Sequence, residues 1–280
     1  MRLGDGQAGR QRRQWLNAGL TEVVPFPHAT MSDMSLTVPP PVPYDAGLRE
    51  RIAGHLAAHE RRVAPTEGRR HAAVAVVLVD SQAGEGRIDP APDGTDHAPL
   101  EPGAAHDLDG RMRDVSGGAA FLLSRRAGRL RAHSGQWALP GGRVDDGEDA
   151  VDAAIRETDE ELGVRLTRDH VLGLMDDYPT RSGYVMTPVV LWGGGPLELR
   201  PSPDEVHAVF RVGLHQLLRS DSPRFLDIPE SDRPVVQIPL GETDRVHAPT
   251  GAVLLQFRRL GLEGDPTRVD DLEQPTFAWR

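Results

Sequence analysis

The chain has 280 residues, of which 38% are apolar, and it contains 24 prolines and 30 glycines. This length allows one large domain with loop or tail segments. The net charge of −10 argues against general nucleic-acid binding, because a surface that follows phosphates needs clustered Lys and Arg. The absence of cysteine excludes disulfides and thiolate chemistry and is compatible with a cytoplasmic protein. No apolar run is long enough to span a bilayer, so no membrane association is expected.

The N-terminal half alternates between proline-rich or polar segments and apolar ones. Residues 1–45 end in a proline-rich run and are predicted to form a flexible extension. Residues 45–62 are predicted to be helical, because apolar side chains recur at helical spacing, namely Leu48, Ile52 and Leu56. Residues 72–80 are β-branched and continuously apolar, which predicts a core strand buried on both faces. Residues 81–117 are rich in Gly, Pro, Asp and Glu and predict a disordered insertion, after which the strand pattern resumes at 118–126.

The C-terminal half contains further apolar segments, some typical of strands and some with helical spacing. Strands are predicted at 184–192, 206–212 and 234–238. A short helix is predicted from Val212 and a longer one over 251–262. A single domain is therefore predicted over 46–262, followed by a C-terminal extension over 263–280.

A glycine-flanked acidic segment, GRVDDGEDAVDAAIRETDEELGV, occupies residues 142–164. It predicts a helix over 149–162 that Gly163 ends. Glu157, Glu160 and Glu161 are spaced i, i+3 and i+4, so their carboxylates converge on one side of this helix. Three like charges repel one another, and a hard divalent cation with oxygen ligands relieves that repulsion. A solvated acidic helix face is the simpler interpretation of the three glutamates alone.

The same segment resembles the Nudix box, and the glycines and the arginine at matching offsets favour the functional interpretation. The matching residues are Gly142, Glu148, Arg156, Glu157, Glu160, Glu161, Gly163 and Val164. Only Thr158 departs, at a position that is usually aliphatic, and its methyl group still allows packing. The resemblance implies an α/β Nudix fold, an α/β/α sandwich with a mixed sheet. It also implies an enzyme that hydrolyses the diphosphate bond of a nucleoside diphosphate linked to another group.

The resemblance also implies roles for individual residues. Mg²⁺ or Mn²⁺ would be bound by three carboxylates and one carbonyl, those of Glu157, Glu160, Glu161 and Gly141. Arg156 would hold Glu157 and Glu148 in place by bidentate pairing. Water would attack phosphorus, and either Glu160 or Glu161 would act as the general base.

The upstream segment LLSRRAGRLRAHSGQWALPGG, residues 122–142, resembles the additional signature of the coenzyme A pyrophosphatases within the Nudix superfamily. The matching residues are Leu122, Leu123, Arg126, Ala127, Arg131, Gly135, Pro140, Gly141 and Gly142. Ser124 and Leu139 replace a Thr and a Phe. The resemblance implies hydrolysis of coenzyme A or acyl-coenzyme A to 3′,5′-ADP and (acyl-)4′-phosphopantetheine. The candidate substrate-binding residues are Arg126, Arg131, His133, Glu148, Thr180 and Ser182.

Other interpretations stay open at this point. The basic cluster over 125–133 suits a highly charged substrate, but it would also serve merely to balance nearby acids. ADP-ribose and dinucleotides such as NADH carry the same diphosphate, and a non-catalytic regulator would keep the fold without turnover. The ligand is in each case a small molecule rather than a nucleic acid. Dimerisation is common in this superfamily, so a homodimer is compatible with the resemblance.

Four further residues have two interpretations each. Glu205 either reaches the metal site from a loop or simply lies at a turn-to-strand junction. Trp137 and Trp192 suit core or pocket walls better than base-stacking platforms. His133 suits a polar substrate contact or a structural role better than a metal ligand, because no second His stands at ligand spacing.

Overall fold

The computed structural model describes residues 36–66, 68–81, 87–88, 115–127, 136–195, 197–241 and 244–275. Within them the helices are α1 (Ala46–Ala58), α3 (Ala150–Leu162) and α4 (Thr250–Gln256), and α4 continues into the π-helical segment η3 (Phe257–Glu263). Two short 3-10 turns are η1 (Arg168–His170) and η2 (Leu214–Gln216). None of the helices in these residues is both long and apolar enough to cross a membrane.

The main sheet is mixed, with a central strand order of β2-β9-β3-β1-β8-β6 among the described residues. Strands β1 and β8 are parallel, and α3 lies between them in the chain, whereas β1 and β3 are antiparallel. Short strands extend the sheet: β5 pairs with β1, β4 with β3 and β7 with β8. The strands are β1 (Arg70–Ser81), β2 (Arg87–Ile88), β3 (Gly118–Arg126), β4 (Trp137–Ala138), β5 (Gly141–Arg143), β6 (Val171–Leu174), β7 (Tyr178–Pro179), β8 (Tyr184–Trp192) and β9 (Val206–Gly213).

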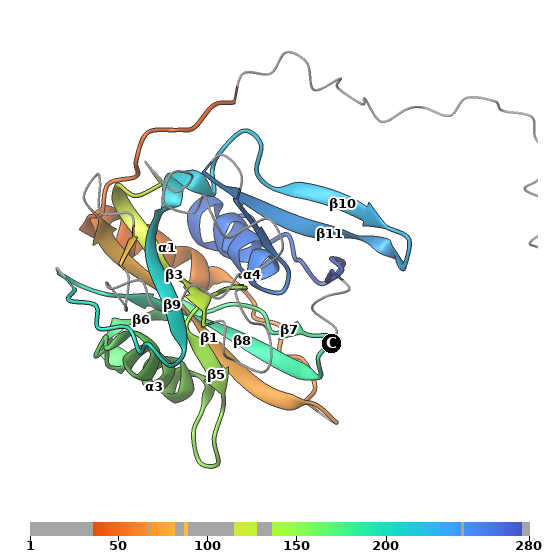
Figure 1. Cartoon of the computed structure of the whole chain (residues 1–280), viewed down its shortest axis with the longest axis horizontal. Coiled ribbons are helices and arrows are strands. Elements are labelled where there is room, and N and C mark those ends of the chain that lie inside the picture. Colours follow the sequence, from red (N-terminus) through yellow and green to blue (C-terminus); the bar gives the residue numbers. More distant parts are fainter. Residues whose placement is uncertain are drawn as a thin grey trace, which may run out of the picture. The chain divides into compact units, whose positions relative to one another are not determined.

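Both faces of the main sheet are buried, which explains the continuous apolar sequence of β1. Successive side chains of a strand point to opposite faces. Accordingly, Val74, Val76 and Leu78 of β1 pack with α1 and α4, whereas Ala75 and Val77 pack with α3. Figure 1 shows α3 on one side of the sheet and α1 and α4 on the other. The architecture is therefore the predicted α/β/α sandwich with a mixed sheet.

A second, three-stranded sheet covers α4. Its strands are antiparallel in the order β10-β11-β12, with β10 at Arg224–Ile228, β11 at Ser231–Leu240 and β12 at Asp244–His247. Apolar residues of β11 and β12, among them Val236, Ile238 and Val246, join the core on the α4 side of the main sheet. The apolar pattern of the sequence predicts only the middle strand of this sheet, at 234–238.

The boundaries of three predicted segments differ in the structure. Residues 36–45, the end of the predicted flexible extension, are anchored: the Ala119 N–H donates to the Val42 carbonyl, and Tyr44 stacks on Trp192 at 4.0 Å. Within the predicted insertion, Arg87–Ile88 pairs with β9. Within the predicted C-terminal extension, Glu273 is 0% exposed and forms a bridge with Val235 of β11. Residues 1–35, 89–114 and 276–280 lie outside the described residues.

Two predicted helices are shorter or less regular than expected. The helix predicted over 45–62 ends at Ala58, where the chain turns to extended backbone at His59. The short helix predicted from Val212 is only the 3-10 turn η2, because Val212 continues β9. The helix predicted over 251–262 is confirmed, although its second half is π-helical.

Candidate active site

Local sequence explains both ends of α3. The side chain of Asp149 accepts hydrogen bonds from the backbone of the first turn, and the Asp149 N–H in turn donates to the Asp152 carboxylate. This capping box satisfies N–H groups that would otherwise lack partners. At the other end Gly163 is left-handed, with φ of 67°, and its N–H donates to Asp159. The predicted helix and its stop at Gly163 are confirmed.

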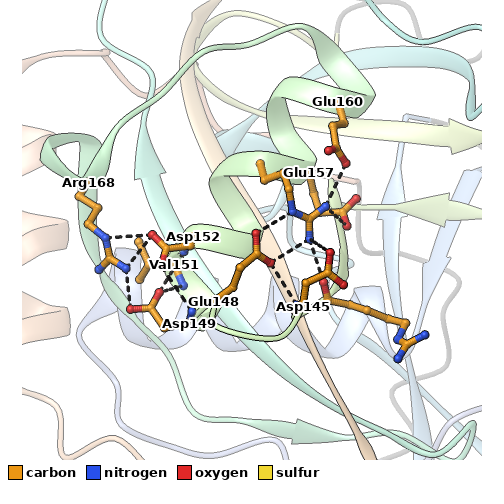
Figure 2. Close-up of polar contacts among 10 residues, drawn as sticks. Asp145, Glu148, Asp149, Val151, Asp152, Glu157, Glu160 and Arg168 are labelled. Atoms are coloured by element: carbon orange, nitrogen blue, oxygen red, sulfur yellow. Dashed lines mark hydrogen bonds and ion pairs between the residues drawn. The ribbon is translucent and has the colours of Figure 1, made fainter.

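Arg156 is the centre of the polar network on α3, and the carboxylates of Glu148, Glu157 and Glu160 that it contacts are labelled in Figure 2. Its Nε and Nη2 donate to the two carboxylate oxygens of Glu148 at 2.8 and 3.1 Å. Its Nη1 donates to Glu157 Oε1 and to Glu160 Oε2, each at 2.9 Å. Nη2 also donates to the Arg143 carbonyl at 3.0 Å. One guanidinium thus ties α3 to the loop before it, as bidentate pairing of arginine allows, and these carboxylates raise the pKa of Arg156.

The glutamates of α3 differ strongly in their exposure to solvent. The side chains of Glu157 and Glu161 are 15% and 5% exposed, whereas that of Glu160 is 56% exposed. Burial raises the pKa of Glu157 above its usual value. Burial, together with the charges of Glu157 and Glu205, raises the pKa of Glu161 to about 8, although Arg126 and a hydrogen bond from the Gly141 backbone oppose this.

Two glycines of β5 permit this arrangement for different reasons. A Cβ on Gly142 would lie 2.1 Å from Glu157 Oε1, so only glycine leaves room for that carboxylate. A Cβ on Gly141 would lie 2.4 Å from the Ala73 carbonyl oxygen, so only glycine allows β5 to pair closely with β1. Gly142 therefore leaves space for the Glu157 carboxylate, and Gly141 allows the strand that precedes the site to pair with the main sheet.

The chemistry of these side chains suits a hard divalent cation. Carboxylates whose pKa values are raised by burial and by neighbouring carboxylates are stabilised when a cation neutralises them, and Mg²⁺ and Mn²⁺ prefer oxygen ligands. In the part of the chain that the structure describes, no group of three His, Asp or Glu side chains is close enough to hold a metal ion. In this arrangement Arg156 binds Glu157 and Glu160, so a cation would have to displace at least one of these hydrogen bonds.

The predicted substrate-binding residues do not form one group. Arg126 lies beside the site, with its Nη1 3.8 Å from Glu161 Oε1, and Glu148 is held by Arg156. Thr180 and Ser182 hydrogen-bond each other at 3.1 Å in the turn between β7 and β8 and take no part in the Arg156 network. Arg131 and His133 lie outside the described residues.

Two other groups contribute to the site. Glu205 lies close enough for its charge to raise the pKa of both Glu157 and Glu161, which supports the interpretation that it reaches the site. The Arg143 carbonyl, which accepts from Arg156, was missed, because a backbone contact leaves no signal in the sequence. Trp137 packs edge-on against Phe210 at 5.1 Å and Trp192 stacks on Tyr44, so both are walls of the core as predicted.

Comparison with known proteins identifies the class of domain. Residues 111–234 match the family model of the NUDIX domain, a span that contains the Arg156 network and the flanking strands β3 to β9. This part of the chain is therefore similar to a NUDIX domain.

Its curated relatives include proteins named "Uncharacterized Nudix hydrolase NudL" from Yersinia pestis (strain Pestoides F) and Yersinia pseudotuberculosis serotype O:1b. Each is 37% identical over 109 residues, which cover 39% of this chain and 55% of the relative. The chain thus spans about half the length of these relatives. Among solved structures, a MutT/nudix family protein from Enterococcus faecalis is 17% identical, with a TM-score of 0.42, and the match covers 80% of this chain and 78% of that one. A MutT protein from Methanosarcina mazei is 19% identical, with a TM-score of 0.33, and the match covers 57% and 83%.

Proposed function

We propose that the chain is a divalent-cation-dependent hydrolase that cleaves the diphosphate bond of coenzyme A or acyl-coenzyme A. The products would be 3′,5′-ADP and (acyl-)4′-phosphopantetheine. The observation that carries the hydrolase proposal is the network in which Arg156 orients Glu148, Glu157 and Glu160 next to the buried Glu161. A regulator without turnover would not need this clustering of carboxylates.

Glu157, Glu160 and Glu161, with the carbonyl of Gly141, would hold Mg²⁺ or Mn²⁺. When bound, the cation supplies neutralisation of the charge that develops on the phosphoryl oxygens and polarises the attacking water. Arg156 keeps Glu148 and Glu157 in position, and Arg126 beside Glu161 offers a guanidinium to a substrate phosphate.

Exposure distinguishes the two candidates for the general base. The attacking water enters from solvent, and a base must lie within hydrogen-bonding reach of that water. The Glu160 side chain is 56% exposed, whereas the Glu161 side chain is 5% exposed. This difference favours Glu160 as the group that accepts the proton, with Glu161 as a buried cation ligand.

The coenzyme A substrate is supported by the resemblance of residues 122–142 to the coenzyme A pyrophosphatase signature and by the position of Arg126 at the site. ADP-ribose and NADH remain the alternatives, because they share the diphosphate. The proposed reaction involves only a small-molecule ligand, and the homodimer and the cytoplasmic location stay predictions.

Turnover of coenzyme A, dephospho-coenzyme A, ADP-ribose and NADH, measured by mass spectrometry of the products with Mg²⁺ and with Mn²⁺, tests the proposal. We expect coenzyme A to yield 4′-phosphopantetheine. We expect Glu160→Gln to reduce the rate about 10²- to 10⁴-fold, because the variant lacks the general base. Wild-type turnover by Glu160→Gln would remove Glu160 from this role. Preference for ADP-ribose or NADH would refute the coenzyme A assignment, and no turnover of any substrate with either cation would refute the hydrolase itself.

A further inference from the structure

A second candidate binding site lies on the α4 side of the main sheet, the opposite side from α3. It is a cavity of about 270 Å³ between the turn after β7, the start of β11 and the segment 270–274. Its apolar wall is formed by Tyr178 and Leu272, which belong to the core on that side. The polar lining includes the guanidinium groups of Arg69, Arg181 and Arg233.

The charges around this cavity do not cancel. Besides the three lining arginines, Arg62 pairs with Asp270 at the rim. Among the described residues, the carboxylates that form ion pairs with these arginines are Asp270 and Glu273. Within the described part of the chain, four guanidinium groups therefore face two carboxylates, a local excess of two positive charges in a chain whose net charge is −10. A local excess of this kind attracts anions.

The buried carboxylate of Glu273 binds two of these arginines, Arg181 and Arg233. Its two carboxylate oxygens accept from Arg181 Nε and Nη2 at 3.0 and 2.5 Å, and Oε2 also accepts from Arg233 Nη2 at 3.3 Å. The Glu273 side chain is 0% exposed, whereas those of both arginines are 46% exposed. The carboxylate is therefore hidden behind the two cations that it orients, and solvent or a ligand meets the guanidinium groups first.

Arg69 is exposed like these two arginines, but it differs from them because no carboxylate within salt-bridge distance is found for it among the described residues. Planar guanidinium groups bind the oxygens of phosphate in fixed, charge-assisted geometry. A phosphate dianion matches the two excess charges, and the Tyr178–Leu272 wall would contact an organic group attached to it.

We propose that this cavity binds a phosphate group, through Arg69 together with the paired Arg181 and Arg233. The site goes beyond the proposed hydrolase activity, because it does not involve the carboxylates of α3. The phosphate comes either from free inorganic phosphate or from a phosphate monoester of a small molecule, such as the 3′-phosphate of coenzyme A.

Isothermal titration calorimetry of the full chain with inorganic phosphate, in EDTA so that no turnover occurs, tests the site. Arg69→Ala should weaken phosphate binding at least about 10-fold, because one charge-assisted contact is lost. Arg51→Ala is the matched control: Arg51 is an exposed arginine of α1, and its removal changes the net charge equally. The control should bind phosphate as the wild type does.

Competition distinguishes the two sources of the phosphate. Displacement of inorganic phosphate by coenzyme A but not by dephospho-coenzyme A would support the site as one for the 3′-phosphate. Binding of phosphate that neither compound displaces would support a separate anion site. Equal binding by Arg69→Ala and the wild type, or no binding by the wild type, would overturn the proposal. Because EDTA prevents turnover, none of these outcomes depends on whether the chain is a hydrolase.

Discussion

Replacing Gly142 by alanine should strongly reduce the rate of turnover but lower the free energy of unfolding only modestly. The new Cβ would lie 2.1 Å from Oε1 and 2.4 Å from Cδ of Glu157, whereas ordinary contact begins at 3.4 Å. The carboxylate must therefore move by about 1 Å, and a misplacement of this size can cost about 10²-fold in rate. Because the obstructing atoms are the end of a flexible side chain, the loss of stability should stay within the range of about 1 to 3 kcal/mol for overpacking.

Two other glycines serve as comparisons. Gly141→Ala should destabilise the fold itself, because its Cβ would meet the Ala73 carbonyl oxygen at 2.4 Å and the Val74 Cα at 2.8 Å, and backbone cannot rotate away. Gly54→Ala lies in α1 with nothing within 4 Å of the added Cβ. It should leave turnover unchanged and stabilise the chain by about 0.5 to 1 kcal/mol through helix propensity.

The assay is steady-state hydrolysis of the substrate found with the wild type, combined with urea denaturation of each variant. The informative result is a Gly142→Ala protein that stays folded but loses about two orders of magnitude in kcat/KM. If the kcat/KM of that variant stayed within about threefold of the wild-type value, the position of the Glu157 carboxylate against Gly142 would not matter for catalysis.

Two further predictions concern stability. Thr158 is 0% exposed and its hydroxyl donates to the Ala154 carbonyl at 2.7 Å, so Thr158→Val should change the unfolding free energy by less than about 1 kcal/mol and leave turnover intact; a loss above about 2 kcal/mol in urea denaturation would contradict this. Arg181 lowers the pKa of Glu273 to about 2, so the carboxylate is more acidic folded than unfolded. Its stabilisation is complete above the unfolded pKa and is lost as the pH falls towards 2. We expect Glu273→Gln to cost about 2 kcal/mol at pH 7, after allowance for screening of the half-exposed arginines. The difference from the wild type should shrink between about pH 5 and pH 3, and urea denaturation that shows a constant difference would argue against the ion pair.

Features that depend on near neighbours in the chain could be predicted from the amino-acid sequence. The capping box at Asp149, the stop at Gly163 and the i, i+3, i+4 spacing of the glutamates are local, so α3 and its carboxylates were predictable. The strands β1, β3 and β8 were predictable as well, because burial on both faces leaves long apolar runs in their sequences, and β9 was predictable from its apolar residues although two polar side chains interrupt them.

Features that join distant segments of the chain depend on tertiary packing and could not be predicted. Arg181 and Glu273 are 92 residues apart, and Glu273 lies in a polar segment whose sequence gives no sign of burial. Strands β4 and β5 span two and three residues, too short for a period of alternation to appear. The difference in exposure between Glu160 and Glu161 likewise depends on what packs against α3. Helix spacing places the carboxylates on one side, but the neighbouring strands and loops determine which of them is buried.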